Sequence, residues 1–194
     1  MNKVLVNGYV LVSLDTSGSI YRGPDRALWE KVDDDYYSGR LPPQLHMAYK
    51  SIKSDDSRGI WWTTCKTLET VISFAEFENK KNHNVEPLAV WSPYLANTQS
   101  CQGWEEPRAT LLGFDVISIG EWSLLRAIQE CQHGAHCEDF EIKVNKAGLL
   151  SNSSSVREVE NKYQKLASEG MVEPIAEVNS GAVVESIEVY SLDL

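Results

Sequence analysis

The stretch CKTLETVISFAEFENKKNHNVEPLAVWS, residues 65–92, decides the fold class because it joins a helical pattern to a strand pattern. Residues 65–80 place apolar side chains at the i, i+3, i+4, i+7 spacing of one helical face, namely Leu68, Val71, Ile72 and Ala75. The acidic residues of the same segment are expected on the outer face: Glu69, Glu76 and Glu78. Residues 85–92 are typical of a strand, which Pro87 weakens because proline cannot donate to the ladder.

Helices and strands are expected on both sides of this stretch. On the N-terminal side we expect a strand or hairpin over residues 3–14, with Asn7-Gly8 as a possible tight turn, a helix over 25–37 and a helix that starts at Pro42-Pro43. On the C-terminal side we expect a loop over 96–108 and three strands, over 110–118, 139–144 and 182–192. Two helices are expected between these strands. One covers 121–131, and the other begins at a Ser155–Glu158 capping box and ends at Gly170. Strict alternation of strands and helices is missing. The sequence therefore predicts a single α+β domain over residues 1–194, with a mixed, mainly antiparallel sheet flanked by about five helices.

The composition is that of an ordinary globular protein. Hydrophobic residues make up 42% of the chain and charged residues 24%. No apolar run approaches the roughly 18 residues of a membrane span. Polar residues and Gly8 interrupt the first residues, MNKVLVNGYVLVSLD, so we interpret them as a strand rather than a signal peptide. We therefore expect a cytoplasmic protein with four reduced cysteines, unless an export segment is missing from the sequence.

The net charge of −10 is concentrated in the second half of the chain. Residues 1–100 hold 11 basic and 12 acidic residues, whereas residues 101–194 hold 7 basic and 16 acidic residues. Such an acidic half repels phosphate backbones, which argues against nucleic-acid binding. It attracts a basic protein surface and speeds the encounter with it, although an acidic surface also keeps a protein soluble without any partner.

The densest group of metal-ligand residues is Cys131-Gln-His133-Gly-Ala-His136-Cys137. Thiolate and imidazole ligands suit zinc, but four ligands in one short loop strain its tetrahedron. Two or three of them could act together with Cys101 or Cys65. The alternatives are a polar loop in which Cys131 packs into the core and a disulfide between Cys131 and Cys137. Zinc is the one cofactor that the sequence brings into consideration, and no cofactor is expected under the leading hypothesis.

Motifs of the common catalytic classes are missing from the sequence. It contains no G-x-S-x-G elbow, no P-loop, no G-x-G-x-x-G and no H-E-x-x-H. The acidic run Asp33-Asp34-Asp35 is most simply the solvated end of a helix, where it opposes the helix dipole at a small cost. Catalytic carboxylates face each other across a cleft, and sequence neighbours rarely do so. We therefore expect a protein that is not an enzyme.

A tryptophan among acidic residues suggests a surface that binds protein. Trp104 is expected in a polar loop beside Glu105 and Glu106, and an exposed tryptophan flanked by acids is typical of an interaction hot spot. The alternative is that its ring folds back onto the body of the protein. We predict a partner-binding face formed by acidic residues and this tryptophan: Trp104, Glu105, Glu106, Glu121, Glu138, Asp139 and Glu141.

Three short segments resemble a known pattern: Leu112-Gly113-Phe114-Asp115-Val116, Ser123-Leu124-Leu125 and Asn145-Lys146-Ala147-Gly148-Leu149-Leu150. Together they resemble the "GYDV…SALSN…LNEYGLL" signature of small bacterial proteins, some of which are immunity-type proteins of toxin–immunity systems. The likeness covers residues 110–170, and the chain has Arg126-Ala127 where the pattern usually has Ser-Asn and carries the Cys/His loop as an extra. It implies a small protein that binds and neutralises a secreted toxin, and it transfers no binding residue.

Three hypotheses for the function follow. The leading one is an immunity protein that occludes the active or binding surface of a cognate, basic toxin, with no role for nucleic acid or membrane. The second is a zinc-binding enzyme or regulator that uses the Cys/His loop over residues 131–137. The third is a structural subunit of a larger assembly. The sequence leaves the oligomeric state open.

Overall fold

A computed structural model describes seven ranges of the chain: residues 4–13, 26–54, 64–93, 103–117, 123–131, 142–172 and 185–194. The elements in chain order are β1 (Val4–Val6), β2 (Gly8–Ser13), α1 (Arg26–Tyr37), α2 (Pro43–Lys53), α3 (Leu68–Asn79), β3 (Val85–Trp91), β4 (Trp104–Glu106), β5 (Ala109–Ile117), α5 (Leu124–Cys131), α6 (Val156–Ser168) and β6 (Glu185–Leu192). All strand pairs among the described residues are antiparallel. The predicted α+β class is confirmed.

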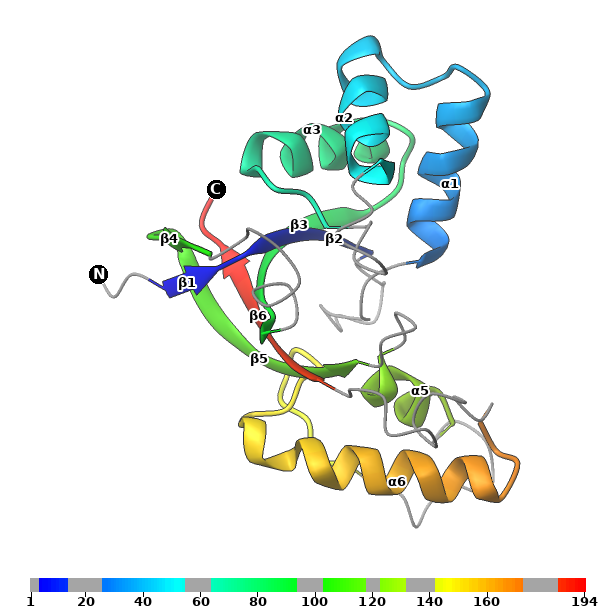
Figure 1. Cartoon of the computed structure of the whole chain (residues 1–194), viewed down its shortest axis with the longest axis vertical. Coiled ribbons are helices and arrows are strands. Elements are labelled where there is room, and N and C mark those ends of the chain that lie inside the picture. The colour runs from blue at the N-terminus through cyan, green and yellow to red at the C-terminus, as the bar shows by residue number, and fades with distance from the viewer. Residues whose placement is uncertain are drawn as a thin grey trace.

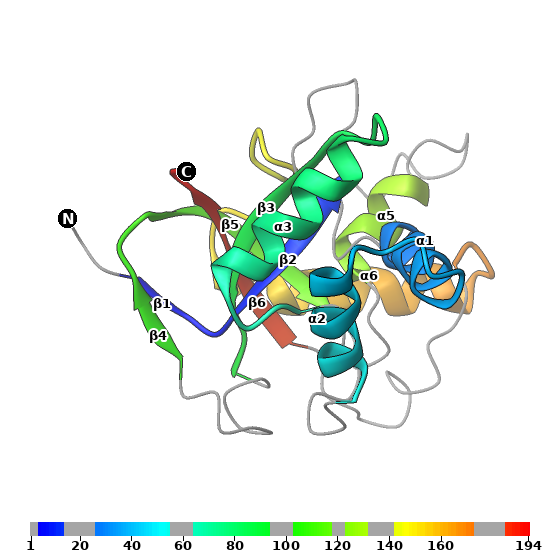
Figure 2. The same cartoon turned by 90° about the horizontal axis from the view of Figure 1, so that it is seen from above.

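Four strands form the main sheet in the order β2-β3-β6-β5, and β1 with β4 forms a separate two-stranded ribbon. Helices α1, α2 and α3 lie beside the β2–β3 side of the sheet, and α5 and α6 lie beside β5 (Figure 1). The view from above shows α3 running across β2 and β3 (Figure 2). The five described helices therefore flank the sheet, as the sequence predicted.

The apolar core follows these layers. One buried cluster joins the first three helices to the sheet and includes Trp29, Tyr49 and Phe74. The Trp29 ring stacks on Tyr49 at 6.0 Å and meets Phe74 edge-on at 5.5 Å. A second cluster joins α5 and α6 to β5 through residues such as Leu125 and Val159. Because aromatic side chains bury the most apolar area, the first cluster fixes the positions of α1, α2 and α3 on the sheet.

The predicted hairpin turn at Asn7-Gly8 is wrong. β1 and β2 do not pair with each other: β1 pairs with β4, and β2 pairs with β3. Asn7 is buried, its Nδ2 donates to the Ser92 carbonyl at 2.7 Å, and its Oδ1 accepts from the Ser92 amide at 3.0 Å. The side chain thus replaces a pair of ladder hydrogen bonds at the point where the chain passes from the ribbon into the main sheet.

The expected strand over residues 85–92 is confirmed as β3, which lies inside the sheet despite Pro87. β2 pairs with β3 along its whole length, but β6 pairs only with Ala89, Val90 and Trp91. The proline therefore lies where β3 has a ladder partner on one side only. This placement agrees with the rule that proline in a sheet occupies a position without a required amide donor.

Three local predictions on the C-terminal side differ from the structure where it describes them. Residues 104–106, expected in a loop, form β4. Of the strand expected over residues 139–144, residues 142–144 form no strand and residues 139–141 lie outside the described ranges. Ser155 makes no side-chain cap bond, because a 3₁₀ turn over Ser153–Ser155 already leads into α6 and the hydroxyl of Ser155 points to Asn152. Gly170 ends this helix as expected, with φ +71° and a bond from the next amide back to Leu166.

Candidate partner-binding site

The ribbon of β1 and β4 holds the three consecutive residues Trp104, Glu105 and Glu106. Its register pairs Val4 with Glu106, Leu5 with Glu105, and Val6 with Trp104. Successive side chains of a strand point to opposite faces, so Glu105 and Leu5 share the outer face. Both are exposed, Leu5 to 44%, whereas Glu106 on the inner face is 3% exposed.

Tyr9 of β2 fixes the inner face of the ribbon. The Trp104 Nε1 donates to the Tyr9 hydroxyl at 3.0 Å, and that hydroxyl donates to Glu106 Oε2 at 2.8 Å. The two rings lie 5.5 Å apart. Burial, together with the Glu106 carboxylate, raises the pKa of Tyr9 to about 12, so the hydroxyl keeps its proton and serves as the donor. One phenol thus joins both inward side chains of β4 to the main sheet.

Arg108 completes the polar cluster behind the ribbon. Its Nε donates to Glu106 Oε1 at 2.9 Å, and its backbone amide donates to the same oxygen at 3.2 Å. Burial would raise the pKa of Glu106, but the hydrogen bonds from Arg108 and Tyr9 outweigh it, so the pKa lies below its usual range. We name Tyr9, Trp104, Glu106 and Arg108 the tyrosine cluster.

The structure corrects part of the predicted binding face. Trp104 is half-buried with its nitrogen bonded to Tyr9, which is the folded-back alternative, and Glu106 is buried and bonded within the chain. Of these three residues only Glu105 is exposed. The physical reason is the alternation of a strand, which turns two of three neighbouring side chains inward. The other predicted residues lie outside the described part of the chain: Glu121, Glu138, Asp139 and Glu141.

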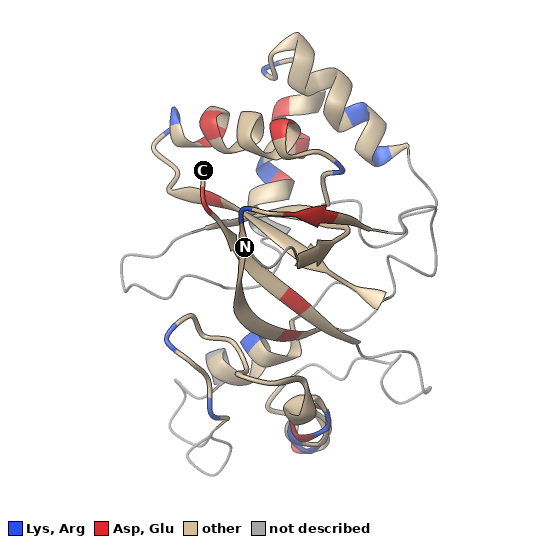
Figure 3. Ribbon diagram, turned by 90° about the vertical axis from the view of Figure 1, so that its left-hand side faces the viewer, with Lys and Arg blue, Asp and Glu red and all other residues tan. Residues whose placement is uncertain are grey.

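Much of the excess of acidic over basic residues in the second half of the chain comes from residues outside the described ranges. Six acids, and no lysine or arginine, occupy the ranges 118–122, 132–141 and 173–184, which the structure does not describe. The described helix α6, in contrast, carries both signs of charge (Figure 3). The electrostatic argument for a basic partner therefore still depends on the sequence.

The structure describes only one residue of the predicted Cys/His site. Cys131 is the last residue of α5, and His133, His136 and Cys137 lie outside the described ranges, as does Cys101. Cys65 is buried, and its backbone forms two hydrogen bonds with Tyr9. In the part of the chain that is described, no three His, Cys, Asp or Glu residues come together as metal ligands.

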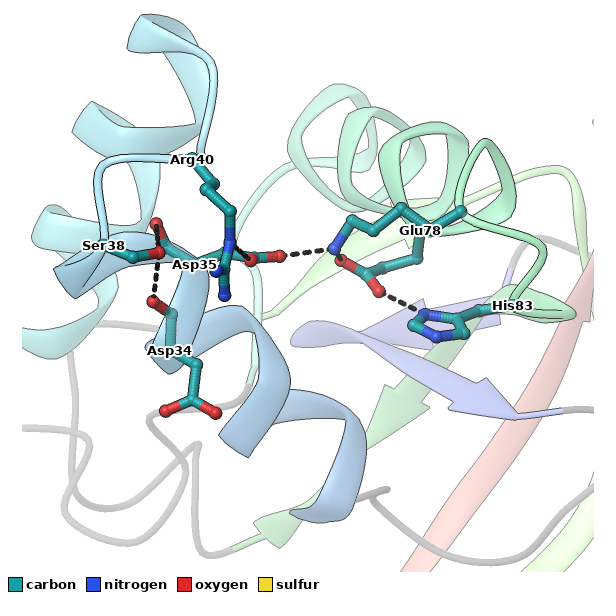
Figure 4. A network of polar contacts seen from close by, with 7 residues as sticks. Asp34, Asp35, Ser38, Arg40, Glu78 and His83 are labelled. Atoms are coloured by element: carbon teal, nitrogen blue, oxygen red, sulfur yellow. Dashed lines mark hydrogen bonds and ion pairs between the residues drawn. The ribbon is translucent and has the colours of Figure 1, made fainter.

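A second polar cluster, which was not predicted from the sequence, joins the C-terminal ends of α1 and α3. Asp35 and Glu78, expected on solvated faces, are 6% and 0% exposed. Lys81 Nζ bonds both carboxylates, with 2.5 Å to Glu78 Oε1 (Figure 4). Arg40 Nε lies 2.5 Å from Asp35 Oδ1, and His83 Nδ1 lies 2.7 Å from Glu78 Oε2. We name these five residues the lysine cluster.

Electrostatics explains how two carboxylates remain buried there. Burial would raise the pKa of Asp35, but the bonds from Lys81 and Arg40 hold it below its usual range. The signal was present in the sequence: Asp35 continues the inward stripe of Leu28 and Val32, and Glu78 continues that of Val71 and Phe74. A charged residue on a core-facing stripe predicts a buried partner of opposite charge.

The comparisons with known proteins give no relative. No protein-family model, no curated protein and no solved structure matches the chain. Among the described residues, no helix has both the length and the apolar character needed to cross a membrane.

Proposed function

We propose that the protein is a binding protein, not an enzyme, that neutralises a bacterial toxin as an immunity protein does. The observation that carries the proposal is the outer face of the β1–β4 ribbon, where the side chains of Leu5 and Glu105 are exposed. The tyrosine cluster holds this ribbon from behind. A surface ordered before binding loses less entropy on association, so its contacts contribute more to affinity.

The acidic second half supports a basic partner. Residues 101–194 hold 16 acidic against 7 basic residues, so a basic toxin would be steered toward this half from a distance. Glu105 would meet a cation of the toxin and Leu5 an apolar side chain. The resemblance of residues 110–170 to immunity-type proteins agrees with the proposal. The proposal also includes the cytoplasm as the site of action.

The proposal is tested by capture followed by rescue. Tagged protein is used to pull a partner from the lysate of the source cell, and the partner gene is expressed in a test strain with and without this protein. We expect one basic partner at one-to-one stoichiometry, toxic alone and harmless together. A partner whose toxicity is unchanged by the protein contradicts the proposal, and stoichiometric zinc without a partner favours the Cys/His alternative.

The site is tested by charge reversal on the captured complex. We expect Glu105→Arg to weaken binding by about tenfold or more, because it places a cation opposite a basic surface, and to reduce the salt dependence of the on-rate. Glu76→Arg on the exposed face of α3 is the matched control, with the same change of charge away from the ribbon. Equal effects of the two substitutions would show that overall charge, not the ribbon, governs binding.

A further inference from the structure

We draw no further inference here: the strongest candidate, the exposed surface patch around Tyr37 and Met47 on α1 and α2, carries nothing because nothing in the structure shows what covers it.

Discussion

The tyrosine cluster and the lysine cluster both contain buried carboxylates, but they neutralise them differently. Each buries a carboxylate to hold together elements that are distant in the sequence: β2 with the ribbon in one case, α1 with α3 in the other. In the tyrosine cluster, Glu106 is the one anion, and it accepts hydrogen bonds from Arg108 and from the neutral Tyr9 hydroxyl. In the second, two anions share one cation, Lys81, at their centre.

The two clusters differ in whether removal of one donor group leaves a buried carboxylate without a cation. Removal of the Tyr9 hydroxyl leaves Glu106 with its own cation, so no buried charge becomes unpaired. Removal of the Lys81 ammonium leaves two buried carboxylates close together, with only Arg40 and His83 at the outer ends. Because an uncompensated buried charge costs more than a lost neutral hydrogen bond, the lysine cluster should be the more sensitive of the two.

The largest effect is expected for Lys81→Met. We expect a loss of about 2–3 kcal/mol in the free energy of unfolding, below the 3–5 kcal/mol of a fully buried pair because Lys81 is partly exposed and Arg40 and His83 remain. Urea denaturation measures this loss. Lys80→Met, at the neighbouring exposed position, is the matched control and should change stability by about 0.5 kcal/mol or less. Equal losses in both variants would mean that Lys81 does not hold the two carboxylates.

The second prediction concerns pH and the same cluster. The pKa of Asp35 is lowered in the folded protein, so its contribution to stability is present above the unfolded value of about 3.9 and is lost as the pH falls through the folded value. We expect Asp35→Asn to flatten the decline of stability below about pH 5. Denaturation curves at a series of pH values measure how the free energy of unfolding declines as the pH falls. Asp34→Asn, at an exposed neighbour, should leave the decline as in the wild type.

Much of the fold, but little of either cluster, follows from the sequence. Helical spacing placed α1, α2 and α3 to within a few residues, because their inward stripes are mostly apolar. Asp35 and Glu78 were assigned to solvent because they are charged, although the same spacing places them on the inward stripes. No local pattern shows that Lys81 will lie between them. The ribbon was missed because its three-residue strands pair across about a hundred residues of sequence.

The third prediction breaks the tyrosine cluster. Tyr9→Phe keeps the ring and removes the hydroxyl that links Trp104 to Glu106, so we expect a loss of about 1–2 kcal/mol. Amide exchange in β1 and β4 should speed up more than exchange in α3, because the ribbon loses its attachment. Thr110→Ser alters an exposed side chain of β5 outside the cluster and should change neither measurement. Uniform acceleration through the whole chain would show instead that the hydroxyl supports the entire core.

The smallest effect is expected at the start of α3, the helix that runs between the two clusters. Its N-cap Thr67 follows Cys65, whose backbone pairs with Tyr9, and its last turn carries Glu78. The Thr67 hydroxyl accepts from the Thr70 amide at 3.3 Å, so Thr67→Ala should cost about 0.5–1 kcal/mol, while Ser73→Ala on the exposed side should cost less.

Hydrogen exchange in the Thr67→Ala variant then distinguishes two cases. Faster exchange confined to the first turn of α3 means that the clusters hold their elements independently. Faster exchange in both the ribbon and the last turn of α3 would mean that the helix couples them, so that the Tyr9 and Lys81 effects would not be additive.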